Sequence, residues 1–441
     1  MILDLLCSLV FLCALAFFGL YRREGVQSTS AYLLADRQMG FFALTATLVM
    51  TELNTATLLS FSSLGYLGGV GALSFPLVFL IGLLFYAVTV AKKWRGFDGF
   101  SVASYFSKRY GRDVGILAGV ALFVAMAVFS GAYLKSLSLL FQPLFLELNT
   151  WVLSGLFVSF ILMLMLRGGL FSIMRTDVFS FVVVLLFFPL MAFFASRGEQ
   201  VSAVVETVSW QFVLSLIVLT MFTYILAPWY GQKIFAAKSE RVAFFSVLCA
   251  ALLIFLLYGL GVMSTWFLKR NGVELSNPEQ ALPMVLMGMP SGLKGLGFTL
   301  LFAASATTLS GVWSAMCTLI TDEKGSVTRS RGHVVMIALS TFVLANTFVD
   351  RVLDKIILAN IPIAALSFAL LGGFYWKKTS RAGVYASIIV GWAVGVGSYL
   401  IIGQEEYTWC WTVIGIPIIF ISGIIGSLLA PNKKLDVKSA L

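Results

Sequence analysis

The sequence predicts an all-α polytopic membrane protein. Of its 441 residues, 60% are hydrophobic and only 11% are charged, whereas a soluble globule of this length needs more charged side chains to cover its surface. A hydrocarbon core of roughly 30 Å requires about 20 apolar residues per helix, and about thirteen such runs can be drawn along the chain. The loops between them are short, so we expect residues 1–441 to form a single transmembrane domain.

The expected spans cover residues 2–21, 40–66, 74–93, 114–142, 150–167, 178–196, 211–231, 242–268, 291–320, 333–349, 353–375, 382–402 and 411–430. The first span has Asp4 before it and Arg22 and Arg23 after it, the reverse of the charge order in a secretory signal, so we expect it to stay as an anchor. Most of the 30 lysines and arginines fall in alternate loops, beginning with the loop after the first span. The positive-inside rule then places the amino terminus outside the cell membrane and the carboxyl terminus in the cytoplasm.

Several function classes are disfavoured by the composition. The net charge of +10 is distributed by loop rather than clustered on one segment, which argues against nucleic acid as a partner. Five cysteines lie scattered in apolar spans and the single histidine, His333, stands at a helix end, so no metal cluster or disulfide framework is expected. There is no Gly-rich phosphate loop to indicate ATP. We expect neither a cofactor nor enzymatic chemistry.

Two spans are interrupted, which indicates an internal repeat. The second contains the polar stretch VMTELNTATLLSF, and the seventh, FTYILAPWYGQK, carries Pro228 and Gly231. These spans lie five apart, as in transporters built from inverted repeats. We therefore expect an amino-terminal helix and loop, two repeats, and carboxyl-terminal helices with a basic tail, over residues 1–39, 40–196, 211–375 and 376–441. The alternative is that Pro228 only kinks a helix or marks its end.

Glu52 lies close to the middle of the bilayer. It is twelve residues into its span, about 18 Å of helical rise from the cytoplasmic edge. A carboxylate at that depth is costly unless it is protonated, paired or facing water, so an intramembrane acid is a functional hypothesis by default. The alternative is a protonated Glu52 that hydrogen-bonds a neighbouring helix.

A second polar cluster lies in the ninth span, in FAASATTLSGVWSAMCTL, and contains Ser305, Thr307, Thr308, Ser310 and Ser314. Hydroxyls on such a helix, together with backbone carbonyls freed by an unwound helix, form a set of hard oxygen ligands that suits Na⁺. The alternative is that these hydroxyls bond only to their own helix backbone, as is common in membranes.

Two further charges stand near span ends. Asp177 begins the sixth span at the cytoplasmic side, where it can hold an ion on its way in or only cap a helix. Lys135, near the outer end of the fourth span, either snorkels to the membrane surface or meets an anionic solute.

Four motifs resemble those of the sodium:solute symporter family when they are taken together. They are AYLLADRQMG, GGLFSIMRTDVFS, GQKIFAAKS and GGFYWKKTSRAG. The resemblance extends from about Ala31 to Ala430, with Arg175 at a position where a tryptophan is common in the family. It implies a five-plus-five inverted repeat with broken first and sixth core helices, and a carrier of small solutes.

The resemblance also implies a sodium site between the first and eighth core helices. Thr307 and Thr308 take the positions of the family's hydroxyl pair, which is more often Ser-Ser or Ser-Thr. Ala304, Met50 and Leu53 would add backbone carbonyls. Glu52 falls where proline carriers have an aspartate, so it would face the ion and solute cavity, and Asp177 would lie on the ion path.

The solute positions differ from those of the family's sugar carriers. Where these present polar side chains, this chain has Thr57, Pro76, Phe79 and Ala227. Sugar hydroxyls left unpaired would cost about 1 to 3 kcal/mol each, so sugar is disfavoured. We place Asn54, Thr57, Phe79 and Trp229 in the solute pocket, with Trp229 either stacking on the solute or marking a membrane interface.

We therefore expect a Na⁺-coupled symporter of a small organic solute, an amino acid or small carboxylate, working by alternating access. A proton on Glu52 could replace sodium in the coupling, which gives a proton-coupled carrier as one alternative. A membrane sensor or scaffold without transport is the other, although the appended signalling domain that such proteins often carry is missing from the sequence.

Overall fold

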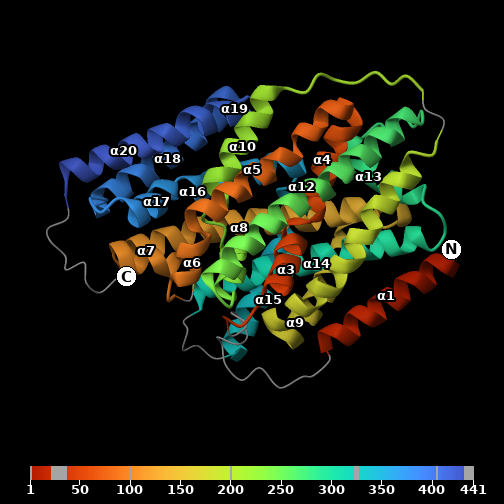
Figure 1. Ribbon diagram of the computed structural model, residues 1–441, viewed down its shortest axis with the longest axis horizontal. Coiled ribbons are helices and arrows are strands. Elements are labelled where there is room, and N and C mark those ends of the chain that lie inside the picture. The colour runs from red at the N-terminus through yellow and green to blue at the C-terminus, as the bar shows by residue number, and fades with distance from the viewer. Residues whose placement is uncertain are drawn as a thin grey trace.

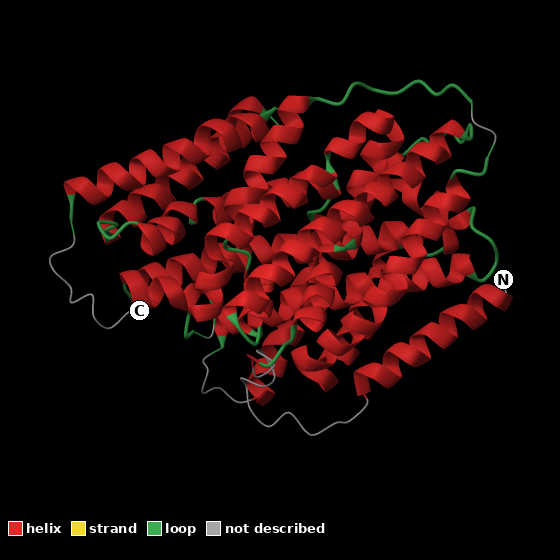
Figure 2. Cartoon of the chain, viewed as in Figure 1, coloured by secondary structure: helices red, strands yellow, loops and turns green. Residues whose placement is uncertain are grey.

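The computed structural model describes residues 2–20, 37–99, 101–198, 201–321, 327–403 and 406–431, and these residues form helices and no β-strand. Figures 1 and 2 show an elongated helical bundle with α1 along one edge and α18 and α20 along another. Part of the expected first family motif, Ala31–Asp36, lies outside the described residues, as do Arg22, Arg23 and most of the basic tail.

The longer helices are α1 (Ile2–Leu20), α3 (Phe41–Glu52), α4 (Thr55–Gly68), α5 (Pro76–Tyr86), α8 (Arg112–Phe141), α9 (Thr150–Ala195), α10 (Trp210–Tyr224), α12 (Glu240–Arg270), α14 (Leu293–Ile320), α15 (Val327–Thr347), α16 (Val352–Ala364), α18 (Arg381–Ile402) and α20 (Ile416–Leu429). The shorter ones are α6 (Lys92–Gly96), α7 (Val102–Tyr110), α11 (Pro228–Phe235), α13 (Ala281–Met287), α17 (Ser367–Tyr375) and α19 (Tyr407–Trp409). Short segments of other helix types connect several of them: η2 (Gly69–Ser74), η3 (Ala87–Ala91), η4 (Gln142–Leu144), η5 (Pro278–Gln280) and η6 (Cys410–Gly415).

The polytopic class expected from the sequence is confirmed. Among the described residues, 8 helices are long and apolar enough to cross a membrane, and two bent helix pairs raise the number to 10. Three shorter apolar helices, Ile2–Phe18, Phe41–Glu52 and Thr150–Leu166, accompany them. The number thirteen itself stays a prediction.

Both expected helix breaks are present. Helix α3 ends at Glu52, Leu53 and Asn54 are not helical, and α4 begins at Thr55. Helix α10 ends at Tyr224, and α11 begins at Pro228 with its axis turned by 48°. Proline lacks the N–H that would continue the helix, so its place at the first residue of α11 both ends one segment and starts the next.

The structure differs from the expected spans in the middle of the first repeat. Helix α9 continues from Thr150 to Ala195, where we expected a loop between residues 167 and 178. Its 46 residues correspond to roughly 69 Å of helical rise, more than twice the hydrocarbon thickness of a bilayer. The sequence around residue 170 contains no proline, so nothing there forces the helix to end. Two apolar stretches, Thr150–Leu166 and Met174–Ala195, still lie on either side.

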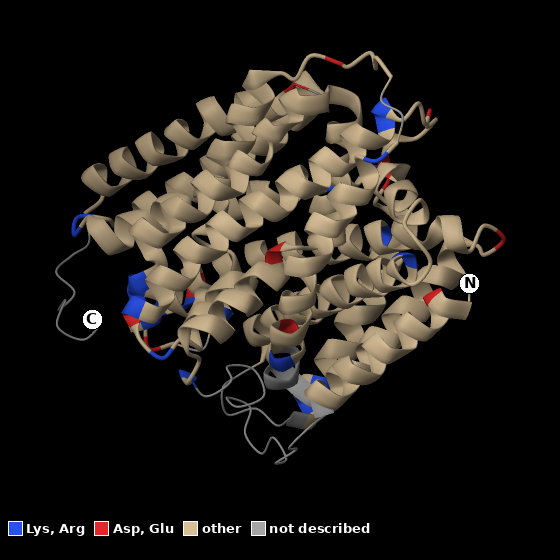
Figure 3. Ribbon diagram, turned by 45° about the vertical axis from the view of Figure 1, so that its right-hand side comes forward, with Lys and Arg blue, Asp and Glu red and all other residues tan. Residues whose placement is uncertain are grey.

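Helix α14 lies inside the bundle and α18 lies on its outside. In the apolar stretch of α14, 89% of the residues are buried within the protein, against 28% for α18. Figure 3 shows the charged residues mainly toward the ends of the helices, with little colour along their middle. One of them, Asp4 in α1, accepts hydrogen bonds from Gly292 N (2.7 Å) and Gly295 N (3.2 Å) and so caps the start of α14.

Candidate ion and solute site

The break between α3 and α4 deprives two backbone carbonyls of their usual helical donors. In a continuous helix Asn54 N would donate to Met50 O, but it donates to Glu52 O at 2.7 Å. Thr55 N would donate to Thr51 O, but it donates to the Ser305 hydroxyl at 3.3 Å. The carbonyls of Met50 and Thr51 are therefore left without partners from their own helix.

The hydroxyl of Thr308 on α14 lies against both of these carbonyls. Its Oγ1 is 3.1 Å from Met50 O, 3.2 Å from Thr51 O and 2.9 Å from Ala304 O. A hydroxyl has one hydrogen, so it can satisfy only one of these three acceptors fully. The residue is 1% exposed. The Thr308 hydroxyl and the three carbonyls thus bring four buried oxygens together, and oxygen ligands of this kind suit a small hard cation.

Two other expected sodium ligands, Thr307 and Leu53, do not make the contacts that Thr308 makes. Thr307 Oγ1 donates to Ala304 O at 3.0 Å, so this hydroxyl bonds within its own helix, as the alternative interpretation held. Thr308 instead also reaches across to α3. Leu53 lies at the break, and the hydrogen bonds of the described residues do not tie it to either threonine; its N–H donates to Val49 O. Thr51, whose carbonyl contacts Thr308, was not expected from the sequence.

Glu52 is enclosed in protein and is 1% exposed. Its Oε2 accepts a hydrogen bond of 2.7 Å from the Tyr224 hydroxyl, and the indole of Trp229 faces the carboxylate. No described residue donates to Oε1. Helix α12 is joined to the same residue, because the Tyr258 hydroxyl donates to the backbone carbonyl of Glu52.

Aromatic side chains surround this carboxylate. The ring of Phe79 lies 5.5 Å from that of Tyr224 and 5.2 Å from that of Tyr258. The ring of Trp229 lies 5.2 Å from that of Phe129 and 6.2 Å from that of Tyr224. Trp229 is 3% exposed, so it does not mark a membrane interface. Of the residues expected in the solute pocket, Phe79 and Trp229 thus belong to an aromatic shell around Glu52, which also includes Tyr133 and Tyr230.

Asn54, expected in the solute pocket, caps α4. Its Oδ1 accepts a hydrogen bond of 2.8 Å from Thr57 N, and its Nδ2 donates to Glu52 O at 2.9 Å. Both contacts fix the shape of the break. Thr57 takes part in the same cap through its backbone.

We expect Asn54→Ala to lower the free energy of unfolding by about 1 kcal/mol, because the first turn of α4 loses its side-chain acceptor. Thermal unfolding of the purified protein in detergent measures the change. Asn54→Ser is the control, since serine is an equally good capping residue and should retain most of the stability. An alanine variant as stable as the parent would contradict the capping role.

Asp177 does not stand at a loop edge but is buried against Lys233 of α11. Lys233 Nζ lies 3.0 Å from Asp177 Oδ2, and the two side chains are 1% and 0% exposed. The seventh expected span, residues 211–231, leaves Lys233 in the loop that follows. That boundary is wrong, because α11 continues to Phe235 and carries the lysine into the bundle. Helix α3 lies against α9, α11 and α14, so both charged residues are close to the carbonyls of the break.

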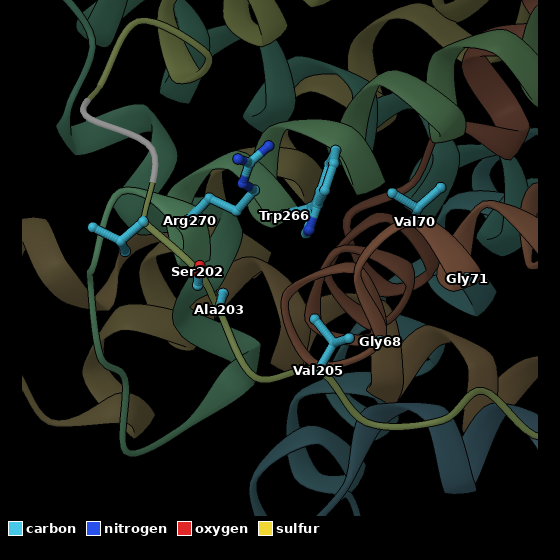
Figure 4. Close-up of a pocket in the computed structure, with 9 residues that line it drawn as sticks. Gly68, Val70, Gly71, Ser202, Ala203, Val205, Trp266 and Arg270 are labelled. Atoms are coloured by element: carbon cyan, nitrogen blue, oxygen red, sulfur yellow. The ribbon is translucent and has the colours of Figure 1, made fainter.

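Backbone hydrogen bonds tie down both ends of the broken helix. Before α3, Met39 exchanges backbone hydrogen bonds with the segment after α11, to Ala236 O at 2.9 Å and from Lys238 N at 2.8 Å. In the last turn of α4, Leu67 O accepts a hydrogen bond of 2.9 Å from Glu206 N. A cavity of about 290 Å³ lies at this second end, with Trp266 and Arg270 beside it, as Figure 4 shows. It is separate from Glu52.

Comparison with known proteins identifies a family match and a shared fold. Residues 32–208 match the model of the sodium:solute symporter family, which confirms the expected resemblance over that part of the chain. No curated protein gives a significant match. A substrate-bound, outward-open Na⁺-coupled sialic acid symporter has a TM-score of 0.80 at 15% identity, with 99% of this chain and 99% of that chain covered. A nucleobase-cation-symport-1 family transporter in a closed conformation with bromovinylhydantoin bound has a TM-score of 0.56 at 15% identity, with 90% and 92% covered. The chain thus shares its fold with both.

Proposed function

We propose that this multi-pass membrane protein is a Na⁺-coupled symporter that imports a small organic solute by alternating access. The observation that carries the proposal is the contact of the Thr308 hydroxyl with Ala304 O and with the two carbonyls freed at the helix break. Met50, Thr51, Ala304 and Thr308 would hold the ion, with Thr307 and Leu53 beside them. The match of residues 32–208 to a family of sodium symporters supports the same conclusion.

The ion would join α3 to α14. Because the carbonyls come from one helix and the hydroxyl from the other, a bound cation favours the arrangement in which these helices touch. The Tyr258 hydroxyl ties the residue next to the ion site, Glu52, to α12. Sodium binding thereby shapes the surroundings of Glu52, which links ion occupancy to solute affinity.

The solute is proposed to be an amino acid. One oxygen of the Glu52 carboxylate receives no hydrogen bond from the described residues, and Tyr224 and Trp229 lie against the carboxylate. A carboxylate with aromatic faces attracts an ammonium group by charge and by cation–π interaction. The same surroundings repel a solute whose only charge is a carboxylate. Sugar is disfavoured because the shell around Glu52 offers few hydrogen-bonding side chains besides tyrosine hydroxyls.

The topology is proposed from the charge pattern and the two broken helices. The amino terminus lies outside the cell membrane and the carboxyl terminus in the cytoplasm. The two repeats cover residues 40–196 and 211–375, and each has its helix break at its first core helix, before α4 and before α11. Corresponding breaks in the two halves are the arrangement expected of inverted repeats.

Transport in proteoliposomes tests the proposal. With pH clamped on both sides, an inward Na⁺ gradient should drive accumulation of radiolabelled amino acids, and replacing Na⁺ by K⁺ should abolish it. A mixture of small monocarboxylates is the comparison arm and should not accumulate.

The alternative of proton coupling arises from the buried carboxylate of Glu52. Under this alternative, the radiolabelled amino acids should accumulate in the same vesicles when an inward proton gradient is applied without Na⁺. That outcome would contradict sodium coupling and leave the fold unaffected.

A further inference from the structure

The ammonium group of Lys233 is surrounded by oxygen atoms. Nζ lies 3.0 Å from Asp177 Oδ2, 3.0 Å from Thr47 O and 2.7 Å from Thr47 Oγ1, and it also contacts Thr51 Oγ1. These acceptors come from α3 and α9, while the lysine comes from α11. Four oxygens, one of them from a carboxylate, thus converge on one buried positive charge.

The two hydroxyls direct lone pairs toward the lysine. Thr47 Oγ1 donates its hydrogen to Asp177 Oδ2, and Thr51 Oγ1 donates its hydrogen to Thr47 O at 2.6 Å. Each hydroxyl oxygen is therefore left as an acceptor for Nζ. A carboxylate, a carbonyl and two hydroxyl oxygens without free hydrogens are ligands that a small hard cation also prefers. Asp177 Oδ1 is buried and receives no hydrogen bond from the described residues, so one oxygen of this carboxylate is left without a donor among them.

The cage adjoins the sodium site proposed above. Thr51 belongs to both, with its carbonyl near Thr308 and its hydroxyl near Lys233. A buried carboxylate must be neutralised by a partner charge, and at Asp177 the chain supplies this charge from its own α11.

We propose that Lys233 is a tethered cation that fills a second cation site, formed by Thr47, Thr51 and Asp177, so that one Na⁺ rather than two binds per chain. The expected count of one Na⁺ rests on the proposed function, because that ion occupies the Thr308 site. The second site, filled by Lys233, does not depend on it. Asp177 would then take part in the ion path only while Lys233 is displaced from it. An ion leaving the Thr308 site reaches Asp177 only when α11 has withdrawn its lysine.

Equilibrium binding of radiolabelled Na⁺ to the purified full-length protein tests this. We expect one Na⁺ per parent chain and one additional Na⁺ in Lys233→Ala, because removal of the ammonium exposes the cage to the ion. Adding Asp177→Asn to that variant should remove the additional ion. Lys238→Ala is the matched control, since Lys238 is exposed on the same segment and its removal should leave the count unchanged.

The outcomes separate the two proposals. Two ions on the parent chain, or no additional ion in Lys233→Ala, would overturn the tethered cation and leave sodium coupling intact. No ion on the parent but one on Lys233→Ala would contradict the Thr308 site and support the tethered cation. Should Lys233→Ala not fold, the count on the parent chain still decides, because a second ion requires the cage that the lysine fills.

Discussion

Thr308→Val is expected to weaken Na⁺ binding by about 10- to 100-fold. Valine has the shape of threonine but no oxygen, so three backbone carbonyls lose the hydroxyl that completes the set around the ion. Interactions of a hydroxyl with a charged group contribute about 1.5 to 3 kcal/mol, and each 1.4 kcal/mol corresponds to a tenfold change in affinity. The measurement is Na⁺-dependent protection against thermal unfolding, titrated with Na⁺ at constant ionic strength.

Two further variants test whether the Thr308 oxygen itself binds the ion. Thr308→Ser keeps the oxygen and should bind Na⁺ nearly as the parent does. Thr307→Ala should have a smaller effect than Thr308→Val, because the Thr307 hydroxyl contacts only a carbonyl of its own helix. If Thr307→Ala removed Na⁺ binding and Thr308→Val did not, the ligand assignment would be reversed.

Glu52→Gln is expected to reduce the affinity for an amino acid by about 100-fold or more, while Na⁺ binding persists. The substitution keeps the volume of the side chain and removes the charge. Removing one partner of a buried charge pair costs about 3 to 5 kcal/mol, since the other charge then stays in the interior without compensation. Uptake of the radiolabelled amino-acid mixture and the Na⁺ titration are measured on the same preparation.

Glu52→Asp and Tyr224→Phe test which property of the site matters. The aspartate keeps the charge on a shorter side chain and should retain part of the uptake. Tyr224→Phe removes the only hydroxyl that donates to Oε2 within the described residues and should lower affinity less than Glu52→Gln, because a single hydrogen bond is lost rather than a charge. Unchanged uptake in Glu52→Gln would contradict an ammonium-bearing solute.

Both broken helices could be predicted from the sequence because their causes are local. Polar residues at 52, 54 and 55 interrupt an otherwise apolar span, and Pro228 cannot continue a helix. The meeting of Thr308 with Met50 came from the family resemblance rather than from periodicity. A single sequence states which residues can coordinate a cation, but a contact 258 positions away along the chain depends on how the two helices pack.

The misses have equally specific reasons. The expected loop between residues 167 and 178 rested on the end of an apolar run, and a less apolar stretch alone does not end a helix that has no proline. A capping box formed by Ser101 and Ser104 marks the start of α7, a helix that lies outside the expected spans. Lys233 falls just outside the expected span 211–231 because a charged residue ends an apolar run, whether or not its side chain is buried. The sequence does contain an indication that Lys233 is helical. It lies five residues after Pro228, and a proline often stands at the first residue of a helix, as it does in α11.

Thr51 has a consequence for how two charges act on each other. One residue presents its carbonyl to the Thr308 hydroxyl and its own hydroxyl to the Lys233 ammonium. Any rotation of its backbone or side chain that improves one set of contacts changes the other. The sodium ion and the Lys233 ammonium, which contact the same residue, would also repel each other. Binding free energies are coupled reciprocally. If bound sodium weakens the ion pair between Asp177 and Lys233, that ion pair therefore weakens sodium binding by the same free energy.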